Sequence, residues 1–168
     1  SASTISRRFK RTSTKKLQEL RERGLEGYDL VALVLDGKTF AEDTMVVALG
    51  ITIMGEKVIL GFVETGTENA SVCTRFLREL EERGLRFTDG LLVVIDGGKG
   101  LYKAVKAVFE GRAFVQRCQW HKRENVLSYL TKAHQQSFRQ KLQRAYAQPT
   151  YKQAKAALEQ VRRELMLV

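Results

Sequence analysis

Two short stretches decide how this chain is expected to fold. Residues 30–37 have the sequence Leu-Val-Ala-Leu-Val-Leu-Asp-Gly, and residues 91–98 have the sequence Leu-Leu-Val-Val-Ile-Asp-Gly-Gly. Each stretch begins with an uninterrupted apolar run and then reaches Asp-Gly, a dipeptide that is common in turns. Runs of this length and composition predict strands that are buried on both faces of a sheet.

The segments around these runs predict further elements in a definite order. Strands are predicted at residues 45–54, 57–65 and 113–117, with a hairpin at Gly55-Glu56, and helices at residues 4–23, 72–80, 101–109, 121–130, 134–147 and 151–166. An antiparallel meander followed by right-handed βαβ crossovers places the fourth strand beside the first and parallel to it. We therefore expect an α/β protein with a ribonuclease H-like mixed sheet of about five strands, flanking helices and a C-terminal helical segment.

Asp36 and Asp96 stand at the ends of the two apolar runs. If these strands are parallel neighbours ~4.8 Å apart, both carboxylates project from one edge of the sheet, where open α/β sheets bind ligands. Two adjacent carboxylates repel each other unless a hard divalent cation such as Mg²⁺ lies between them. A pair of such ions stabilises the attacking and leaving oxygens of a phosphodiester displacement. The alternative is that both Asp-Gly pairs are ordinary turns, with Asp36 opening a hairpin loop over residues 37–43.

Two further motifs follow the predicted strand ends. Residues 97–100, Gly-Gly-Lys-Gly, lack the spacing of a nucleotide-binding P-loop. We interpret these glycines as room for a DNA backbone, with Lys99 contacting phosphate. Cys118 and His121 form a Cys-x-x-His pair, which supplies two of the four ligands of a structural zinc site. Without two more ligands at a suitable spacing, local packing and hydrogen bonding are the expected role of this pair.

The charge distribution points to a polyanionic partner. The net charge is +10, and the distribution is uneven: residues 1–23 hold eight Lys/Arg and two Asp/Glu, residues 24–100 seven and thirteen, and residues 101–168 fourteen and four. This layout fits a nucleic-acid binder with a carboxylate-bearing centre, although two solvated basic helical regions flanking a neutralising core would give the same pattern. No apolar run reaches the ~20 residues of a membrane span. Two cysteines in 168 residues indicate a reducing compartment such as the cytoplasm.

Several motifs together resemble the Mutator-type transposases of bacterial insertion sequences. They are Leu-Asp-Gly-Lys-Thr-Phe-Ala-Glu-Asp at 35–43, Val-Ala-Leu-Gly at 47–50, Leu-Gly-Phe at 60–62, Val-Ile-Asp-Gly-Gly-Lys-Gly-Leu at 94–101 and Gln-Arg-Cys-Gln-Trp-His-Lys-Arg-Glu-Asn-Val at 116–126. The similarity continues through residues 147–150 and 154–158, so it covers nearly the whole chain.

This resemblance implies a DNA transposase with a ribonuclease H-like catalytic domain and an Asp-Asp-Glu triad that binds Mg²⁺ or Mn²⁺. Asp36 matches the first aspartate and Asp96 the second, while Cys118 and His121 match the family's signature near the active site. The candidate DNA-binding residues are Arg7, Arg8, Lys99, Arg117, Lys122 and Arg123. The implied partners are insertion-sequence ends, target DNA and further copies of the chain. The implied location is the bacterial nucleoid.

The resemblance also implies that the chain has three parts and that it lacks the third catalytic carboxylate. Residues 1–23 match the end of the family's DNA-binding region, residues 24–120 an incomplete catalytic core and residues 121–168 the start of a helical insertion. The family's catalytic Glu lies beyond that insertion, so we assign no third carboxylate here.

Other glutamates and aspartates of the chain are not expected to replace the missing group: Glu124, Glu159 and Glu164 lie on other helices, and Glu42, Asp43 and Glu64 are expected to be solvated charges at strand ends. We expect a transposase fragment that is inactive alone. The alternatives are a non-catalytic or inhibitory DNA-binding product and another two-metal nuclease of the same fold.

Overall fold

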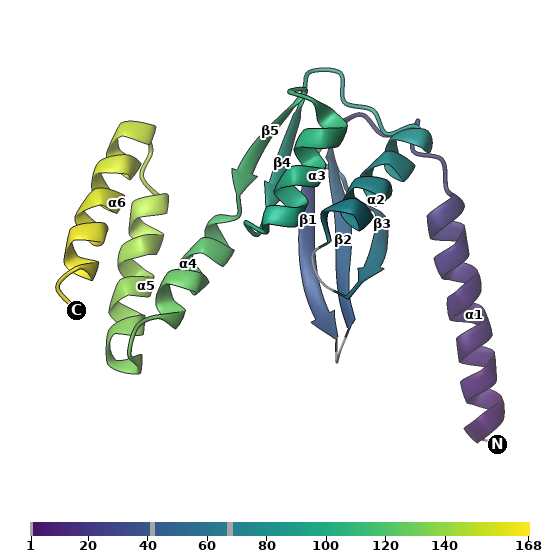
Figure 1. The fold of residues 1–168 in the computed structure, drawn as a ribbon, viewed down its shortest axis with the longest axis horizontal. Helices are drawn as coiled ribbons and strands as arrows, with labels where there is room; N and C mark the ends of the chain where they lie inside the picture. The colour runs from purple at the N-terminus through teal and green to yellow at the C-terminus, as the bar shows by residue number, and fades with distance from the viewer. Residues whose placement is uncertain (1, 41–42, 67–68) are drawn as a thin grey trace. The chain divides into compact units, whose positions relative to one another are not determined.

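The computed structural model describes residues 2–40, 43–66 and 69–168. They form two compact units, Ser1–Gln116 and Arg117–Val168, which are described separately (Figure 1). The finer division at residues 23 and 120 remains a prediction from the sequence.

The first unit is built on a five-stranded mixed sheet. Its elements are α1 (Ala2–Glu22), β1 (Leu30–Phe40), β2 (Asp43–Thr52), β3 (Lys57–Thr65), α2 (Ala70–Glu82), β4 (Leu91–Ile95), α3 (Lys99–Phe109) and β5 (Ala113–Arg117). The strand order is β3-β2-β1-β4-β5, with β1 antiparallel to β2, β2 antiparallel to β3, and β1 parallel to β4. This is the ribonuclease H-like arrangement that the order of strands and helices predicted.

Helices α2 and α3 cover one face of this sheet (Figure 1). Their buried side chains recur every three to four residues, as expected for an amphipathic helix; they are Cys73, Phe76, Leu77, Leu80, Leu101, Ala104, Val105, Val108 and Phe109. They pack against alternate residues of the central strands, among them Leu33, Leu35, Val93 and Ile95. This layer is the core of the first unit, and it fixes how β1 and β4 lie against each other.

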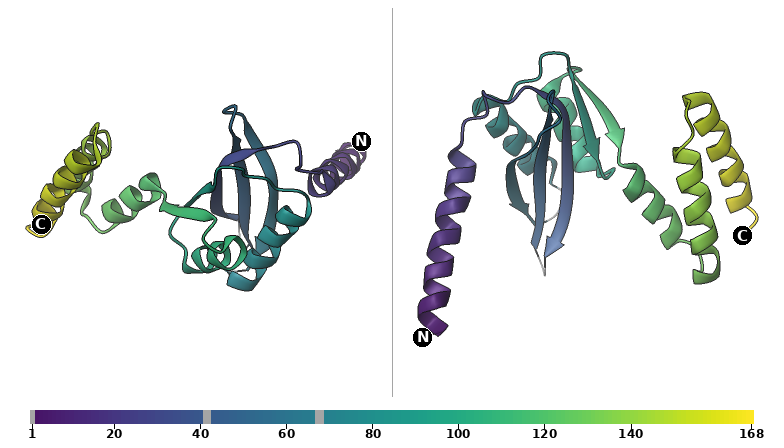
Figure 2. Two further views of the ribbon diagram at one scale, coloured as in Figure 1. Left: turned by 90° about the horizontal axis from the view of Figure 1, so that it is seen from above. Right: turned by 180° about the vertical axis from the view of Figure 1, so that it is seen from behind.

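The expectation that β1 and β4 are buried on both faces is wrong for this unit. Val31 is 41% exposed, Leu92 is 43% exposed, and Phe114 on β5 is 75% exposed. Because side chains alternate along a strand, Leu92 faces away from the layer that buries Leu91 and Val93. The strands lie in the foreground when the molecule is seen from behind (Figure 2, right). An apolar run therefore indicates a strand, but it does not tell how many of its faces are covered.

The C-terminal end of α1 is joined to the end of α2 by Arg83, the C-cap residue of α2. This side chain donates from Nη2 to the carbonyl oxygen of Leu20 (2.9 Å) and from Nε to that of Arg23 (3.0 Å). Carbonyl groups at a helix end have no partners within the helix, so a cation that binds them also opposes the negative end of the helix dipole. Burial, followed by the charge of Arg23, lowers the pKa of the Arg83 guanidinium.

The second unit is a small helical assembly of α4 (Gln119–Ser128), α5 (Lys132–Tyr146) and α6 (Tyr151–Leu165). Its core contains Leu127, Phe138, Leu142 and Val161. The Lys141 side chain of α5 forms an ion pair with Glu164 of α6. Across both units, none of the described helices is long and apolar enough to span a bilayer.

Candidate metal and DNA site

The pairing of β1 with β4 brings Asp36 and Asp96 to neighbouring backbone positions. These strands are parallel, and their register runs from Ala32 opposite Leu92 to Leu35 opposite Ile95. Asp36 and Asp96 are therefore the next residues on two neighbouring strands, and both side chains are partly buried. Strands paired in this way lie about 4.8 Å apart, so the two carboxylates leave the same edge of the shared ladder.

The two aspartates differ in their backbone setting, which corrects the sequence interpretation of Asp36. Asp96 follows the last residue of β4, whereas β1 continues past Asp36 to Phe40. The antiparallel partner β2 supports this extension, with Asp36 opposite Val47. The alternative of a hairpin loop over residues 37–43 is therefore wrong for the described residues 37–40 and 43, which lie in β1 and β2, while residues 41 and 42 lie outside the described part. Asp36 is held on a paired strand, which makes its position firmer than a loop would.

Asp96 is oriented by the turn that leads into α3. The backbone N–H of Gly98 donates to Oδ1 of Asp96 (2.8 Å), and Gly97 has a φ of 106°, which is accessible mainly to glycine. Helix α3 begins at Lys99, with Gly98 as its N-cap. The N-terminal end of α3 thus lies next to the Asp96 carboxylate. Lys99 is exposed in the first turn of the same helix.

The donor set of this edge suits a hard divalent cation but is small. Carboxylate oxygens are the ligands that Mg²⁺ and Mn²⁺ prefer, and Mg²⁺ keeps several waters when few protein ligands are present. No cluster of three or more His, Cys, Asp or Glu that would suit a metal occurs among the described residues. Of the other carboxylates considered, Glu64 is exposed on β3, Glu124 and Glu164 form ion pairs in the second unit, and Glu42 lies outside the described part. The two aspartates fit such an ion as partial ligands.

Cys118 and His121 belong to the second unit. Cys118 is the N-cap residue of α4 and has a free, partly buried thiol. His121 lies in the first turn of α4, and its ring meets the neighbouring Trp120 ring edge to face, with the centroids 4.9 Å apart. The structure thus places both residues where β5 gives way to α4.

The candidate DNA-binding residues occupy several elements. Arg7 and Arg8 are exposed on α1, and Lys99, Arg117 and Lys122 are exposed elsewhere.

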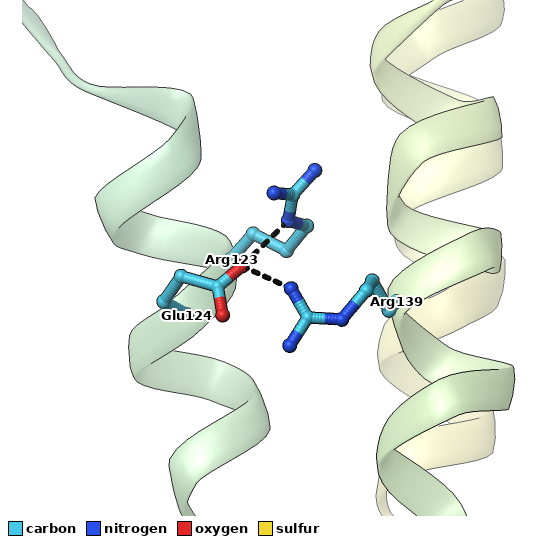
Figure 3. Close-up of polar contacts among 3 residues, drawn as sticks. All are labelled: Arg123, Glu124 and Arg139. Atoms are coloured by element: carbon cyan, nitrogen blue, oxygen red, sulfur yellow. Dashed lines mark hydrogen bonds and ion pairs between the residues drawn. The ribbon is translucent and has the colours of Figure 1, made fainter.

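Arg123 differs from the other candidates in being largely enclosed. Its side chain is 13% exposed, and its Nε donates to Oε1 of Glu124 (3.0 Å). The same oxygen accepts from Nη1 of Arg139 on α5 (Figure 3). The hydrogen bond from Arg139 is the main cause that lowers the pKa of Glu124 below its usual value, and the hydrogen bond from Arg123 lowers it further. The contact with Arg139 joins α4 to α5. Sequence inspection did not single out Arg139, because its distance of 15 residues from Glu124 matches no helical spacing.

The strand order and the parallel pairing of β1 with β4 define this chain as a ribonuclease H-like α/β protein. A family model described as "Transposase, Mutator family" matches residues 1–167. The chain therefore belongs to the Mutator family of transposases, which confirms the resemblance seen in the motifs.

The relatives in this family are insertion-sequence transposases. The chain is 30% identical over 166 residues to the transposase of IS905 from Lactococcus lactis, which covers 95% of the chain and 41% of that protein. It is 37% identical over 94 residues to the transposase of IS256 in Tn4001 from Staphylococcus aureus, which covers 56% of the chain and 23% of that protein. The chain thus corresponds to well under half the length of these relatives.

Retroviral integrases are among the similar solved structures. The HTLV-2 integrase catalytic core domain in complex with magnesium has a TM-score of 0.35 and 13% identity, covering 81% of this chain and 86% of that chain. A chain of a simian T-cell lymphotropic virus intasome has a TM-score of 0.36 and 12% identity, covering 81% and 49%. The fold assignment itself rests on the strand order and pairing described above.

Proposed function

We propose that Asp36 and Asp96 are two ligands of a divalent metal centre, Mg²⁺ or Mn²⁺, with which an insertion-sequence transposase cleaves DNA and transfers strands. The observation that carries this proposal is the parallel register that ends at Leu35 and Ile95, immediately before the two aspartates. A divalent ion at this position would act as a Lewis acid on phosphodiester oxygens. Membership of a transposase family supports DNA as the substrate.

The residues of this chain would bind and orient the reacting groups. The Gly98 N–H holds one Asp96 oxygen, so this carboxylate needs little reorganisation before it binds a cation. The glycines at residues 97, 98 and 100 present little side-chain bulk toward an approaching DNA backbone. Lys99, exposed beside them, would contact a phosphate and neutralise part of its charge.

The small number of metal ligands supports a second part of the proposal, which concerns the activity of this chain alone. Among the described residues no group of three or more His, Cys, Asp or Glu could hold a metal, so the proposed centre has only Asp36 and Asp96 as its ligands from these residues. We propose that the centre is completed by a carboxylate from outside these residues and that this chain alone cleaves DNA poorly or not at all. The second candidate is a non-catalytic DNA-binding product, and the same count of two ligands favours it.

Self-association belongs to the proposal as well. Apolar side chains such as Leu92 and Phe114 are exposed on one face of the sheet. Exposed apolar surface of this kind supports contacts between copies of the chain, which would form the working complex on nucleoid DNA. Sedimentation of the chain with and without element-end DNA measures this assembly directly. A chain that stays monomeric on DNA would contradict this part.

A paramagnetic titration tests the metal site without requiring activity. Added Mn²⁺ should broaden the backbone NMR signals around residues 36 and 96 in the wild type, and Asp36→Asn should abolish that local broadening. Asp89→Asn is the matched control, because Asp89 is an exposed carboxylate in the turn before β4. Broadening that survives Asp36→Asn, or that is equally lost in Asp89→Asn, would refute the assigned ligands.

A strand-cleavage assay on element-end DNA tests the expected inactivity. With Mn²⁺ present, the chain should bind this DNA with a steep salt dependence and yield no specific nicks. Robust cleavage that Asp96→Asn abolishes would show that two carboxylates suffice and would overturn the third-ligand proposal.

A further inference from the structure

The second unit contains a hollow that the proposed metal chemistry does not use. Its volume is about 550 Å³, within the range of small-ligand pockets. One wall is formed by Lys122 and Tyr129 at the α4 side, and another by His134 near the start of α5. Leu165 at the end of α6 contributes an apolar surface, and Arg117 also lines the hollow.

The charge around this hollow favours an anion. Arg117 and Lys122 contribute two cations, and none of the side chains of the described residues that line the hollow is acidic. The unit as a whole holds eleven Lys/Arg and three Glu. Two of those glutamates, Glu124 and Glu164, are already bound to basic side chains of α5. A polyanion is therefore attracted to this unit, with its phosphates near the basic side chains.

An exposed aromatic ring distinguishes this hollow from a site that binds phosphate alone. Tyr129 is 91% exposed at the C-cap of α4, although a tyrosine ring gains free energy from burial. Exposed aromatic rings next to basic grooves stack on the bases of single-stranded nucleic acid. In duplex DNA the faces of each base are covered by its neighbours, so only an unpaired base offers its face to such a ring. The apolar surface of Leu165 and the neighbouring Val126 suits the base as well.

We propose that this hollow binds one unpaired nucleotide of single-stranded DNA, with its base stacked on Tyr129 and its phosphate close to Lys122. The inference rests on the proposed function only in taking DNA as the ligand, and it uses neither Asp36 nor Asp96. It assigns the helical unit the role of holding a strand that has left the duplex.

Binding of a labelled oligonucleotide, as a single strand and as a duplex, tests this assignment. Tyr129→Ala should weaken single-strand binding about ten-fold and change duplex binding by less than about two-fold. Tyr129→Phe keeps the ring and should bind like the wild type. Tyr151→Ala is the matched control, because Tyr151 is 82% exposed in the same unit and does not line the hollow. Lys122→Ala should weaken both forms and lower the salt dependence by about one phosphate contact.

Photocrosslinking to a strand that carries 5-iodouracil locates the contact directly. The crosslink should fall on the tryptic peptide 124–132, in which Tyr129 is the only aromatic residue. Crosslinking confined to other peptides, or equal losses for Tyr129→Ala and Tyr151→Ala, would overturn the assignment. Circular dichroism of each variant shows that its helices are intact.

The two proposals fail separately in these experiments. If Mn²⁺ broadening is absent but Tyr129→Ala still weakens single-strand binding selectively, only the metal proposal fails. If the broadening is present and Tyr129→Ala has no effect, only this inference fails.

Discussion

The attachment of α1 gives a prediction that can be worked out from individual hydrogen bonds. Arg83→Ala removes the two hydrogen bonds from the guanidinium to the Leu20 and Arg23 carbonyl oxygens. Hydrogen bonds that involve a charged group contribute roughly 1.5–3 kcal/mol each. The freed carbonyls can bind water because Arg83 is only partly buried, so we take about 1 kcal/mol for each bond. The expected loss of about 2 kcal/mol corresponds to an opening equilibrium about 30-fold more favourable.

Hydrogen exchange measures this opening at the end of α1. In Arg83→Ala the amides of residues 20–23 should exchange about 30-fold faster, while the core strands stay protected. Arg83→Lys should lie between this variant and the wild type, because an ammonium group does not reproduce the two-pronged geometry of the guanidinium. Arg78→Ala is the control, since Arg78 is exposed on α2, the helix that Arg83 caps. Unchanged exchange in Arg83→Ala, or the same acceleration in Arg78→Ala, would refute the anchoring role.

Three further predictions concern the stability of the two units. Leu77→Ala should lower the free energy of unfolding of the first unit by about 2–5 kcal/mol in urea titrations, because Leu77 is fully buried; a loss below 1 kcal/mol would contradict the packing. Gly84→Ala should cost at least about 1–2 kcal/mol by the same measurement, since φ is +89° and a Cβ would lie 2.5 Å from Cγ of Glu26; a neutral effect would refute the strain. Glu124→Gln should lower the thermal midpoint at neutral pH. The carboxylate's pKa is depressed in the folded state, so its stabilising contribution is present above the unfolded pKa near 4.5 and disappears as the pH falls through the folded value. The difference between wild type and Glu124→Gln should therefore shrink in acid, and a difference independent of pH would exclude the ion pair with Arg139 as its cause.

The order of the strands and helices could be predicted from the sequence alone, and so could the positions of Asp36 and Asp96 directly after apolar runs. The apolar runs before Asp36 and Asp96 are strands because they hold five or six consecutive apolar residues, many of them β-branched. Gly84 follows the end of α2 with a φ of +89°, a conformation in which glycine is the favoured residue. Both aspartates could be predicted at neighbouring positions because each follows an apolar run and because right-handed βαβ crossovers place the fourth strand beside the first and parallel to it.

Which surfaces are covered and which charges form ion pairs became visible in the folded structure alone. Val31 and Leu92 look buried from sequence but are partly exposed, since covering a face depends on which helices pack on it. Arg123 appears in the sequence as one basic residue among many, and only the folded unit shows that its partner Glu124 also pairs with Arg139 on α5. The hollow beside Tyr129 likewise joins residues from α4, α5 and α6. Contacts between distant residues depend on packing in three dimensions, which no local sequence period records.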